Sequence, residues 1–212
     1  MMQYYAEDTE KIFSEDVADE LYEKDTQEIN SLTETEKEKL YPKEAVGNSS
    51  RKNVEPVGEN ESSIGTFGDI LVSYTFSSFG FDIGVPGHAG IVHTNEARTI
   101  ESFPEGNGYA NGVRRYTNDW KDRGHSYGVR VKGATKADYT AAAKYAIAQI
   151  GKPYNWNYFN KGTTDSFYCS QLVWRAWKNQ GFDIDRMNLG DWEPVSPAEL
   201  VGGSNTYVFY KD

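Results

Sequence analysis

The sequence predicts an α+β fold in which a small antiparallel sheet packs on helices. Strand-like segments occupy the first half of residues 63–212, two helical segments follow, and one strand-like segment comes last. The composition is 38% hydrophobic and 14% aromatic, which suffices for one well-filled core. A change in charge near residue 62 separates this domain from an N-terminal extension.

The extension carries all of the excess charge. Residues 1–62 hold 17 acidic and 7 basic residues, whereas residues 63–212 hold 15 of each, so the net charge of −10 lies before the domain. We expect a helix over about 8–24, a short helix over about 33–40 and a linker over 47–63. An acidic extension on a neutral domain argues against binding to nucleic acid or to anionic lipid, because both require basic patches.

Short runs of β-branched and aromatic residues predict the strands. They cover residues 68–72, 88–93, 98–103, 127–132 and, at the end of the chain, 206–210. Between them, residues 77–87 and 104–125 are expected to be mostly loop, since they contain many Gly, Ser and Asn residues.

Apolar residues at helical spacing predict two helices, over residues 135–150 and 168–179. Gly151 ends the first, as expected of a residue that caps a helix C-terminus. A short third helix is expected at 196–199, where Ser-Pro-Ala-Glu forms a capping box with proline at the first helical position. The irregular, aromatic stretch 151–168 joins the two long helices.

No stretch of about 18 apolar residues is present, so no membrane span is expected. The first residues turn acidic after Met-Met-Gln-Tyr-Tyr and lack the basic and apolar regions of a signal peptide. A signal that had been removed would leave the same pattern. The expected location therefore stays open between the cell envelope or exterior and the cytoplasm.

The single cysteine, Cys169, is predicted to lie in the first turn of a helix. Backbone N–H groups are unpaired there and carry positive potential, which lowers a thiol pKa and favours the nucleophilic thiolate. The same N–H groups can bind the oxyanion of a tetrahedral intermediate. This position predicts a nucleophile, although a lone cysteine in a helix is more often a small buried hydrophobic residue.

A thiolate also needs a base, and the chain has three histidines. His88 begins a strand directly after a Pro-Gly pair, whereas His93, five residues on, points to the opposite face, and His125 lies in a Gly-flanked loop. Glu101, on the next strand of a predicted hairpin, is the candidate that orients His88. Each of these residues can also be merely structural. A zinc site from His88, His93 and Cys169 is not expected, because strand parity separates the histidines.

Five segments of the domain, taken in order, carry a resemblance. They are Gly68-Asp69-Ile70, Gly87-His88-Ala89-Gly90-Ile91-Val92, Ile150-Gly151-Lys152-Pro153-Tyr154, Tyr168-Cys169-Ser170-Gln171-Leu172-Val173-Trp174 and Val195-Ser196-Pro197-Ala198-Glu199-Leu200. Together they resemble the circularly permuted, NlpC-type papain-like cysteine amidases of the YiiX/YaeF/YycO type. The resemblance implies a permuted papain-like fold, with Cys169 as nucleophile, His88 as base and Glu101 as orienting residue. It places Tyr154 near the thiol, where it would help to hold the oxyanion.

The resemblance implies a cysteine hydrolase that cleaves amide bonds, in cell-wall peptides or related amides, through a thioester on Cys169. Expected partners are a small peptide, a murein fragment or an acyl substrate, without a cofactor or metal. Two alternatives remain open. One is a lipid acyltransferase or thioesterase of the lecithin:retinol acyltransferase-like branch, with aromatic residues of 154–159 lining an acyl groove. The other is a non-catalytic binding module on the same fold. The sequence does not predict an oligomeric state.

Overall fold

The computed structural model describes residues 33, 62–74, 87–106, 108–186 and 193–212. The helices predicted over 8–24 and 33–40, the linker and most of the loop 77–87 fall outside these ranges, apart from residues 33, 62, 63 and 87. The division of the chain into 1–62 and 63–212 therefore stays a prediction.

One six-stranded antiparallel sheet forms the base of the described domain, with strand order β4-β3-β2-β1-β5-β6. Its strands are β1 (Ile70–Ser73), β2 (His88–Val92), β3 (Arg98–Phe103), β4 (Gly112–Thr117), β5 (Ser126–Val131) and β6 (Thr206–Lys211). The central strands β1 and β2 are buried along their whole length. The predicted α+β class is confirmed.

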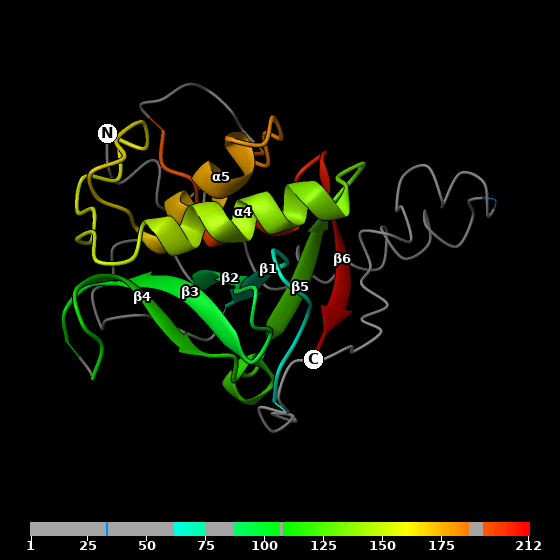
Figure 1. Ribbon diagram of the computed structural model, residues 1–212, viewed down its shortest axis with the longest axis horizontal. Coiled ribbons are helices and arrows are strands. Elements are labelled where there is room, and N and C mark those ends of the chain that lie inside the picture. Colours follow the sequence, from blue (N-terminus) through cyan, green and yellow to red (C-terminus); the bar gives the residue numbers. More distant parts are fainter. Residues whose placement is uncertain (1–32, 34–61, 75–86, 107, 187–192) are drawn as a thin grey trace.

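Within the described ranges, three α-helices accompany the sheet: α4 (Lys136–Ala148), α5 (Cys169–Lys178) and α6 (Pro197–Val201). Figure 1 shows α4 and α5 side by side over one face of the sheet. Local capping residues begin α4 and α6 where the sequence predicts, because Thr135 with Asp138 and Ser196 with Glu199 form capping boxes.

The stretch 104–125, predicted to be mostly loop, also contains two elements that the sequence did not predict, β4 and the 3₁₀-helix η1 (Trp120–Arg123). Strand β4 lies at the sheet edge and pairs only with β3. Because several of its side chains are partly or fully exposed, β4 shows little apolar alternation. Its formation therefore depends on hydrogen bonds with backbone groups elsewhere in the chain. Its start is fixed by Lys152, whose carbonyl accepts a 2.8 Å hydrogen bond from Val113 N–H.

Both faces of the sheet are packed. The main core lies beneath the helices and includes Ile70, Val72, Leu172 and Trp177. A smaller cluster on the other face is formed by Ile64, Leu71, Val92 and Trp120. Residues of β1 contribute alternately to the two clusters. This explains why Ile70, Leu71 and Val72 form a continuous apolar run, as expected of a strand covered on both faces.

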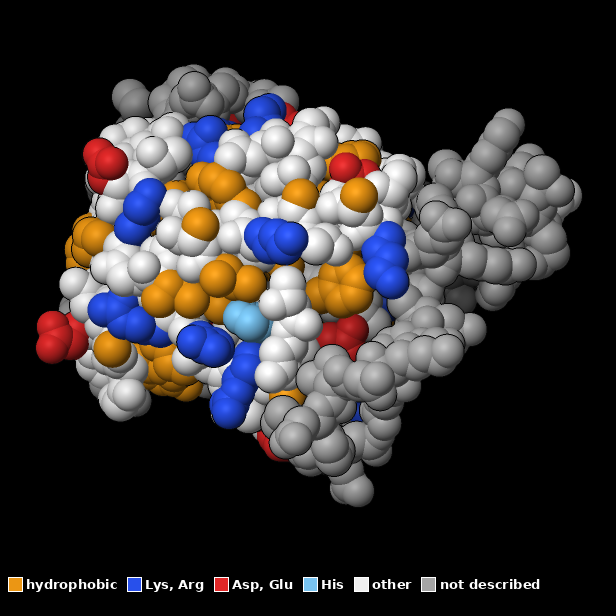
Figure 2. Space-filling model, viewed as in Figure 1, with side chains coloured by type: hydrophobic (Ala, Val, Ile, Leu, Met, Phe, Trp, Pro, Cys, Tyr) orange, Lys and Arg blue, Asp and Glu red, His pale blue; other side chains and the backbone are white. Residues whose placement is uncertain are grey.

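Among the described helices, none combines the length and the hydropathy needed to cross a membrane. Figure 2 shows the face that carries α4. On this face Lys and Arg side chains are scattered among hydrophobic and uncharged ones.

Candidate active site

Cys169 is the first residue of α5, preceded by the N-cap residue Tyr168. Gln171 fixes this end of the helix, because its Oε1 accepts from Tyr168 N–H at 3.1 Å and its Nε2 donates to the carbonyls of Lys161 and Thr163. The thiol is buried, with 9% of the residue surface exposed. The sulfur therefore lies in the field of the helix N-terminus with a narrow opening to solvent.

The structure brings His88 and Glu101 together with this thiol. His88 begins β2, and Glu101 lies on β3 opposite Gly90, so both side chains lie on the same face of the sheet. His88 Nε2 and Glu101 Oε2 are 2.8 Å apart, and both side chains are almost completely buried. With Nε2 held by the carboxylate, Nδ1 is the nitrogen left to interact with the Cys169 thiol, whose charge acts on the imidazole.

Cys169 and His88 shift each other's pKa toward an ion pair. Burial alone would raise the pKa of the Cys169 thiol, but the hydrogen bond and charge of His88, with the Ala89 and Ser170 backbone N–H groups, hold it below its ordinary value. Burial alone would lower the pKa of His88, yet hydrogen bonds with Cys169 and Glu101 raise it. The site therefore favours a thiolate beside an imidazolium.

Glu101 is a fully buried carboxylate at the centre of a set of donors. It accepts from His88, from the Thr99 hydroxyl, from Trp120 Nε1 at 3.3 Å and from two nitrogens of Arg123 at 2.8 and 3.1 Å. Burial would raise the pKa of Glu101, but the charges of Arg123 and His88 lower it to about 2. Glu101 is therefore ionised at all physiological pH values.

Aromatic rings hold the imidazole in its plane. Phe103 stacks on His88 with 4.1 Å between ring centroids and 22° between planes, and Trp120 stacks at 5.8 Å and 15°. Trp120 and Arg123 were not predicted as site residues, because both come from η1, inside a segment predicted to be mostly loop. Only Thr99 carried a signal, since it lies two residues before Glu101 on the same strand face.

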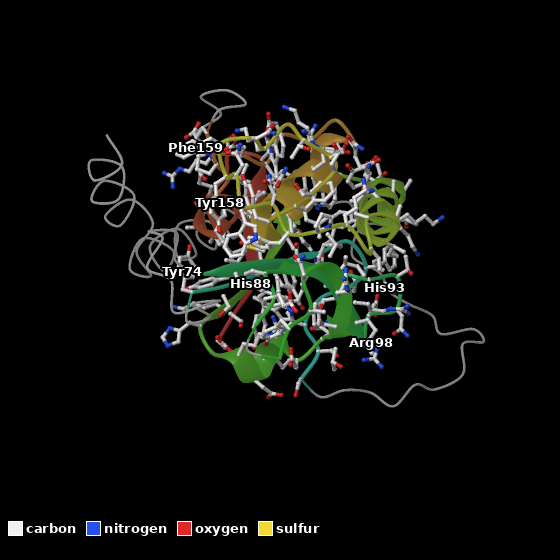
Figure 3. The ribbon with its side chains drawn as sticks, turned by 90° about the vertical axis from the view of Figure 1, so that its left-hand side faces the viewer. Tyr74, His88, His93, Arg98, Tyr158 and Phe159 are labelled. Atoms are coloured by element: carbon white, nitrogen blue, oxygen red, sulfur yellow. The ribbon has the colours of Figure 1, made fainter. Side chains whose placement is uncertain are left out.

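Tyr154, the predicted oxyanion residue, lies within reach of the charge of Cys169. Burial, followed by the negative charge of Cys169, raises the pKa of its phenol. Its hydroxyl lies 3.3 Å from that of Tyr158, and its backbone N–H donates to Asn111. In Figure 3, Tyr158 and Phe159 lie on the same side of the view as His88. The irregular stretch before Cys169 therefore borders the nucleophile with tyrosines.

The other two histidines lie outside the site. His93 follows the end of β2, and its Nδ1 accepts from Asn95 N–H at 2.8 Å. Figure 3 shows His93 and Arg98 on the opposite side of the view from His88. His125 is exposed, and its carbonyl accepts from Tyr74 N–H. The separation of His93 from His88 agrees with strand parity.

A helix that begins at a cysteine and packs on an antiparallel sheet bearing a histidine defines a papain-like architecture. Residues 67–190 match the family model described as "Permuted papain-like amidase enzyme, YaeF/YiiX, C92 family". The match covers more than half of the 212 residues. The chain belongs to this family, and the predicted resemblance is confirmed.

Two relatives illustrate the range of the family. The uncharacterized protein YycO of Bacillus subtilis (strain 168) is 30% identical over 125 residues, which cover 57% of this chain and 47% of YycO. The chain thus spans about half the length of this curated relative. The crystal structure of metalloprotein YiiX from Escherichia coli O157:H7 has a TM-score of 0.53 at 19% identity, over 69% of this chain and 97% of YiiX. This likeness shows the shared fold.

Because YiiX is described as a metalloprotein, we tested whether side chains of this chain fit a metal ion. Within the described ranges, no three His, Cys, Asp or Glu side chains gather in a way that could hold one. Near Cys169 the donors are committed to each other, since His88 Nε2 contacts Glu101 and Glu101 contacts Arg123. The described residues do not fit a metal, and no step below uses one.

Proposed function

We propose that this chain is a cysteine amidase in which Cys169 is the nucleophile, His88 the base and Glu101 the residue that orients His88. One set of observations carries the proposal: the thiol at the start of α5 lies close enough to His88 for the two groups to shift each other's pKa toward an ion pair, and His88 Nε2 lies 2.8 Å from a buried carboxylate. Acyl transfer to a thiol requires a nucleophile beside a base that is itself held by an orienting group, and the three residues have this spatial order.

In the first half of the reaction the Cys169 sulfur attacks the amide carbonyl, and its proton resides on His88. The backbone N–H groups at the start of α5 are candidate donors to the oxyanion, and the Tyr154 hydroxyl is a further candidate. When the C–N bond breaks, His88 gives its proton to the leaving amine, and a thioester remains on Cys169.

The second half regenerates the enzyme. His88 takes a proton from water, the resulting hydroxide adds to the thioester carbonyl, and the C–S bond breaks to release a carboxylic acid. The thiolate and imidazolium are restored. Glu101 holds the imidazole in one plane through both halves of the reaction. The contact between His88 Nε2 and Glu101 Oε2 and the stacked rings of Phe103 and Trp120 restrain the orientation of the imidazole ring.

For the substrate we propose peptide amides, those of cell-wall peptides among them; membership of an amidase family supports the amide bond. The surface beside the thiol suits such a substrate. Trp156 and Phe159 are 58% and 53% exposed, and Trp156 packs against Tyr154 with 5.1 Å between ring centroids. The exposed rings of Trp156 and Phe159, with the asparagines next to them in the chain, form a surface that can bind extended chains of mixed polarity.

The first test measures the rate of iodoacetamide alkylation of Cys169 against pH. We expect an inflection well below the ~8.5 of a free thiol, and an upward shift of this inflection in His88→Ala. An inflection near 8.5 that is unchanged in His88→Ala would refute the pairing of the two residues.

The second test identifies the substrate class by mass spectrometry of Cys169 after incubation with peptide amides, murein fragments and acyl esters. We expect an acyl adduct on Cys169 from the peptide or murein substrates. The Cys169→Ser variant, assayed under conditions that detect a thioester, should carry none. An adduct from the acyl esters alone would instead identify a lipid acyltransferase or thioesterase. A reactive thiol with no adduct from any class would contradict an amidase.

A further inference from the structure

We propose that Arg123 is a positioning residue of this site, which acts through Glu101 to hold His88 in place and to balance the charge against which Cys169 loses its proton. The inference rests on the proposed function, because it concerns the same nucleophile and base. It adds a positioning residue to the nucleophile, base and orienting residue named above.

Arg123 contacts two carboxylates, the buried Glu101 and the half-exposed Asp119, whose Oδ1 lies 2.7 Å from Arg123 Nη2. Two guanidinium nitrogens, Nη1 and Nη2, donate to the two carboxylate oxygens at 2.8 and 3.1 Å, which is a bidentate pair. The Arg123 side chain is 7% exposed, and the guanidinium lies 4.3 Å above the Trp120 ring centroid. Its Nε donates at 2.8 Å to Asp119, which is 49% exposed. The fork therefore fixes both oxygens of Glu101 and leaves Oε2 aimed at His88.

Charge balance gives Arg123 a second effect. With the thiol protonated, His88 and Arg123 carry two positive charges against the one negative charge of Glu101, so the buried set has a net charge of about +1. Loss of the thiol proton brings this set to zero. Without Arg123, the same step takes the buried set from zero to −1, which burial opposes. Removing Arg123 should therefore raise the pKa of Cys169.

Other titratable groups near the set do not change this sign. Asp119 is half exposed, so water screens its charge. The phenols facing Glu101, Arg123 or Cys169 all have a raised pKa and stay neutral below pH 9. They are Tyr109, Tyr116, Tyr154, Tyr158 and Tyr168. The charge of Arg114 lowers the pKa of Tyr116, but burial and the charge of Glu101 outweigh it.

The test is the pH profile of Cys169 alkylation in three variants of the full chain. Arg123→Met removes the charge at similar length, Arg123→Gln retains a hydrogen-bond donor without the charge, and Arg123→Lys retains the charge without the fork. We expect the two neutral variants to move the inflection up by about one pH unit, with alkylation about tenfold slower at a pH below the inflection. Arg123→Lys should keep the inflection near that of the wild type while kcat for amide hydrolysis falls.

Arg130 offers a matched control. It donates to the buried carboxylate of Asp69 through Nε and Nη2, both at 3.0 Å, and lies 4.0 Å above the Phe209 ring centroid. Arg130→Met thus removes an arginine of similar burial from a similar pair elsewhere in the sheet. We expect it to lower the thermal unfolding temperature without moving the thiol inflection.

Either neutral variant, if folded, with the wild-type inflection would overturn the inference. So would an equal shift in Arg130→Met, which would indicate general loosening, or an inflection in Arg123→Lys as high as in Arg123→Gln. These outcomes differ from a failure of the proposed function, which would show as an ordinary thiol inflection in the wild type. Arg123→Gln keeps the test open if Arg123→Met does not fold.

Discussion

Gly90 is the residue whose replacement most directly tests how the sheet positions Glu101. It lies on β2 opposite Glu101, two residues after His88. A Cβ atom at this position would lie 2.9 Å from Glu101 Cγ and 3.0 Å from Trp120 Cζ2. The absence of a side chain therefore lets Glu101 lean across its neighbouring strand to reach His88.

The geometry gives the size of the effect. Carbon atoms pack best at about 3.5–4.0 Å, so Glu101 in Gly90→Ala would have to retreat by roughly half an ångström or more. Its donors His88, Trp120 and Arg123 hold it from several sides and resist this movement. Since a misplacement of about 1 Å can cost about 10²-fold in rate, we expect kcat to fall about tenfold. Overpacking should also cost about 1–3 kcal/mol of stability.

The assay compares kcat and the free energy of unfolding for the wild type, Gly90→Ala and Gly128→Ala. Gly128 is a fair control, because it lies on β5 of the same sheet and an added Cβ would lie 2.5 Å from Phe209 Cζ, away from Glu101. We expect the control to lose stability and keep kcat. A kcat for Gly90→Ala within twofold of the wild type, or an equal kcat loss in Gly128→Ala, would refute the reasoning.

Three further predictions concern charge and domain organisation. Glu101→Gln places an amide among donors, so kcat should fall by about 10²-fold or more in a protein whose circular dichroism spectrum stays native; a loss of only a few-fold would move the orienting role elsewhere. Burial, with the charges of Asp185 and Glu193, raises the pKa of Glu199 to about 7, so its stabilising contribution is present below about pH 4.5 and is lost as pH rises through about 7. Urea denaturation should therefore show wild-type stability falling by about 3 kcal/mol relative to Glu199→Gln across that range, and parallel pH curves would contradict it. Deleting residues 1–60 should leave a folded domain with unchanged alkylation of its thiol, whereas an aggregated product would place the domain boundary earlier.

Local signals explain which parts of the fold the sequence predicts. Helices α4 and α6 begin at capping boxes whose partners lie three residues apart, so a short window contains the information. The hairpin of β2 and β3 is also predictable from a short window of sequence. Its short connection forces antiparallel pairing, which places Glu101 within reach of His88. The pairing of these two residues could therefore be expected before any coordinates were known.

Long-range contacts explain what the sequence does not predict. Strand β4 has no apolar alternation of its own and forms on the ladder of β3 and the carbonyl of Lys152. The 3₁₀-helix η1 comes directly after β4 in the chain and brings Trp120 and Arg123 to Glu101. A buried carboxylate requires a cation, but composition alone cannot indicate which of 22 basic residues provides it.

The order of residues in the chain matters less to this site than the order of strands in the sheet. His88 and Glu101 precede Cys169 here, yet α5 packs against β2 and β3, so the thiol meets the imidazole wherever the chain is opened. The segment that borders the thiol is instead local to α5. In this chain residues 151–168 lead directly into α5, and Gln171 anchors them through the carbonyls of Lys161 and Thr163. The stretch that carries the exposed aromatic rings is thus fixed to the same helical turn as the nucleophile, which is why we expect it to govern substrate choice.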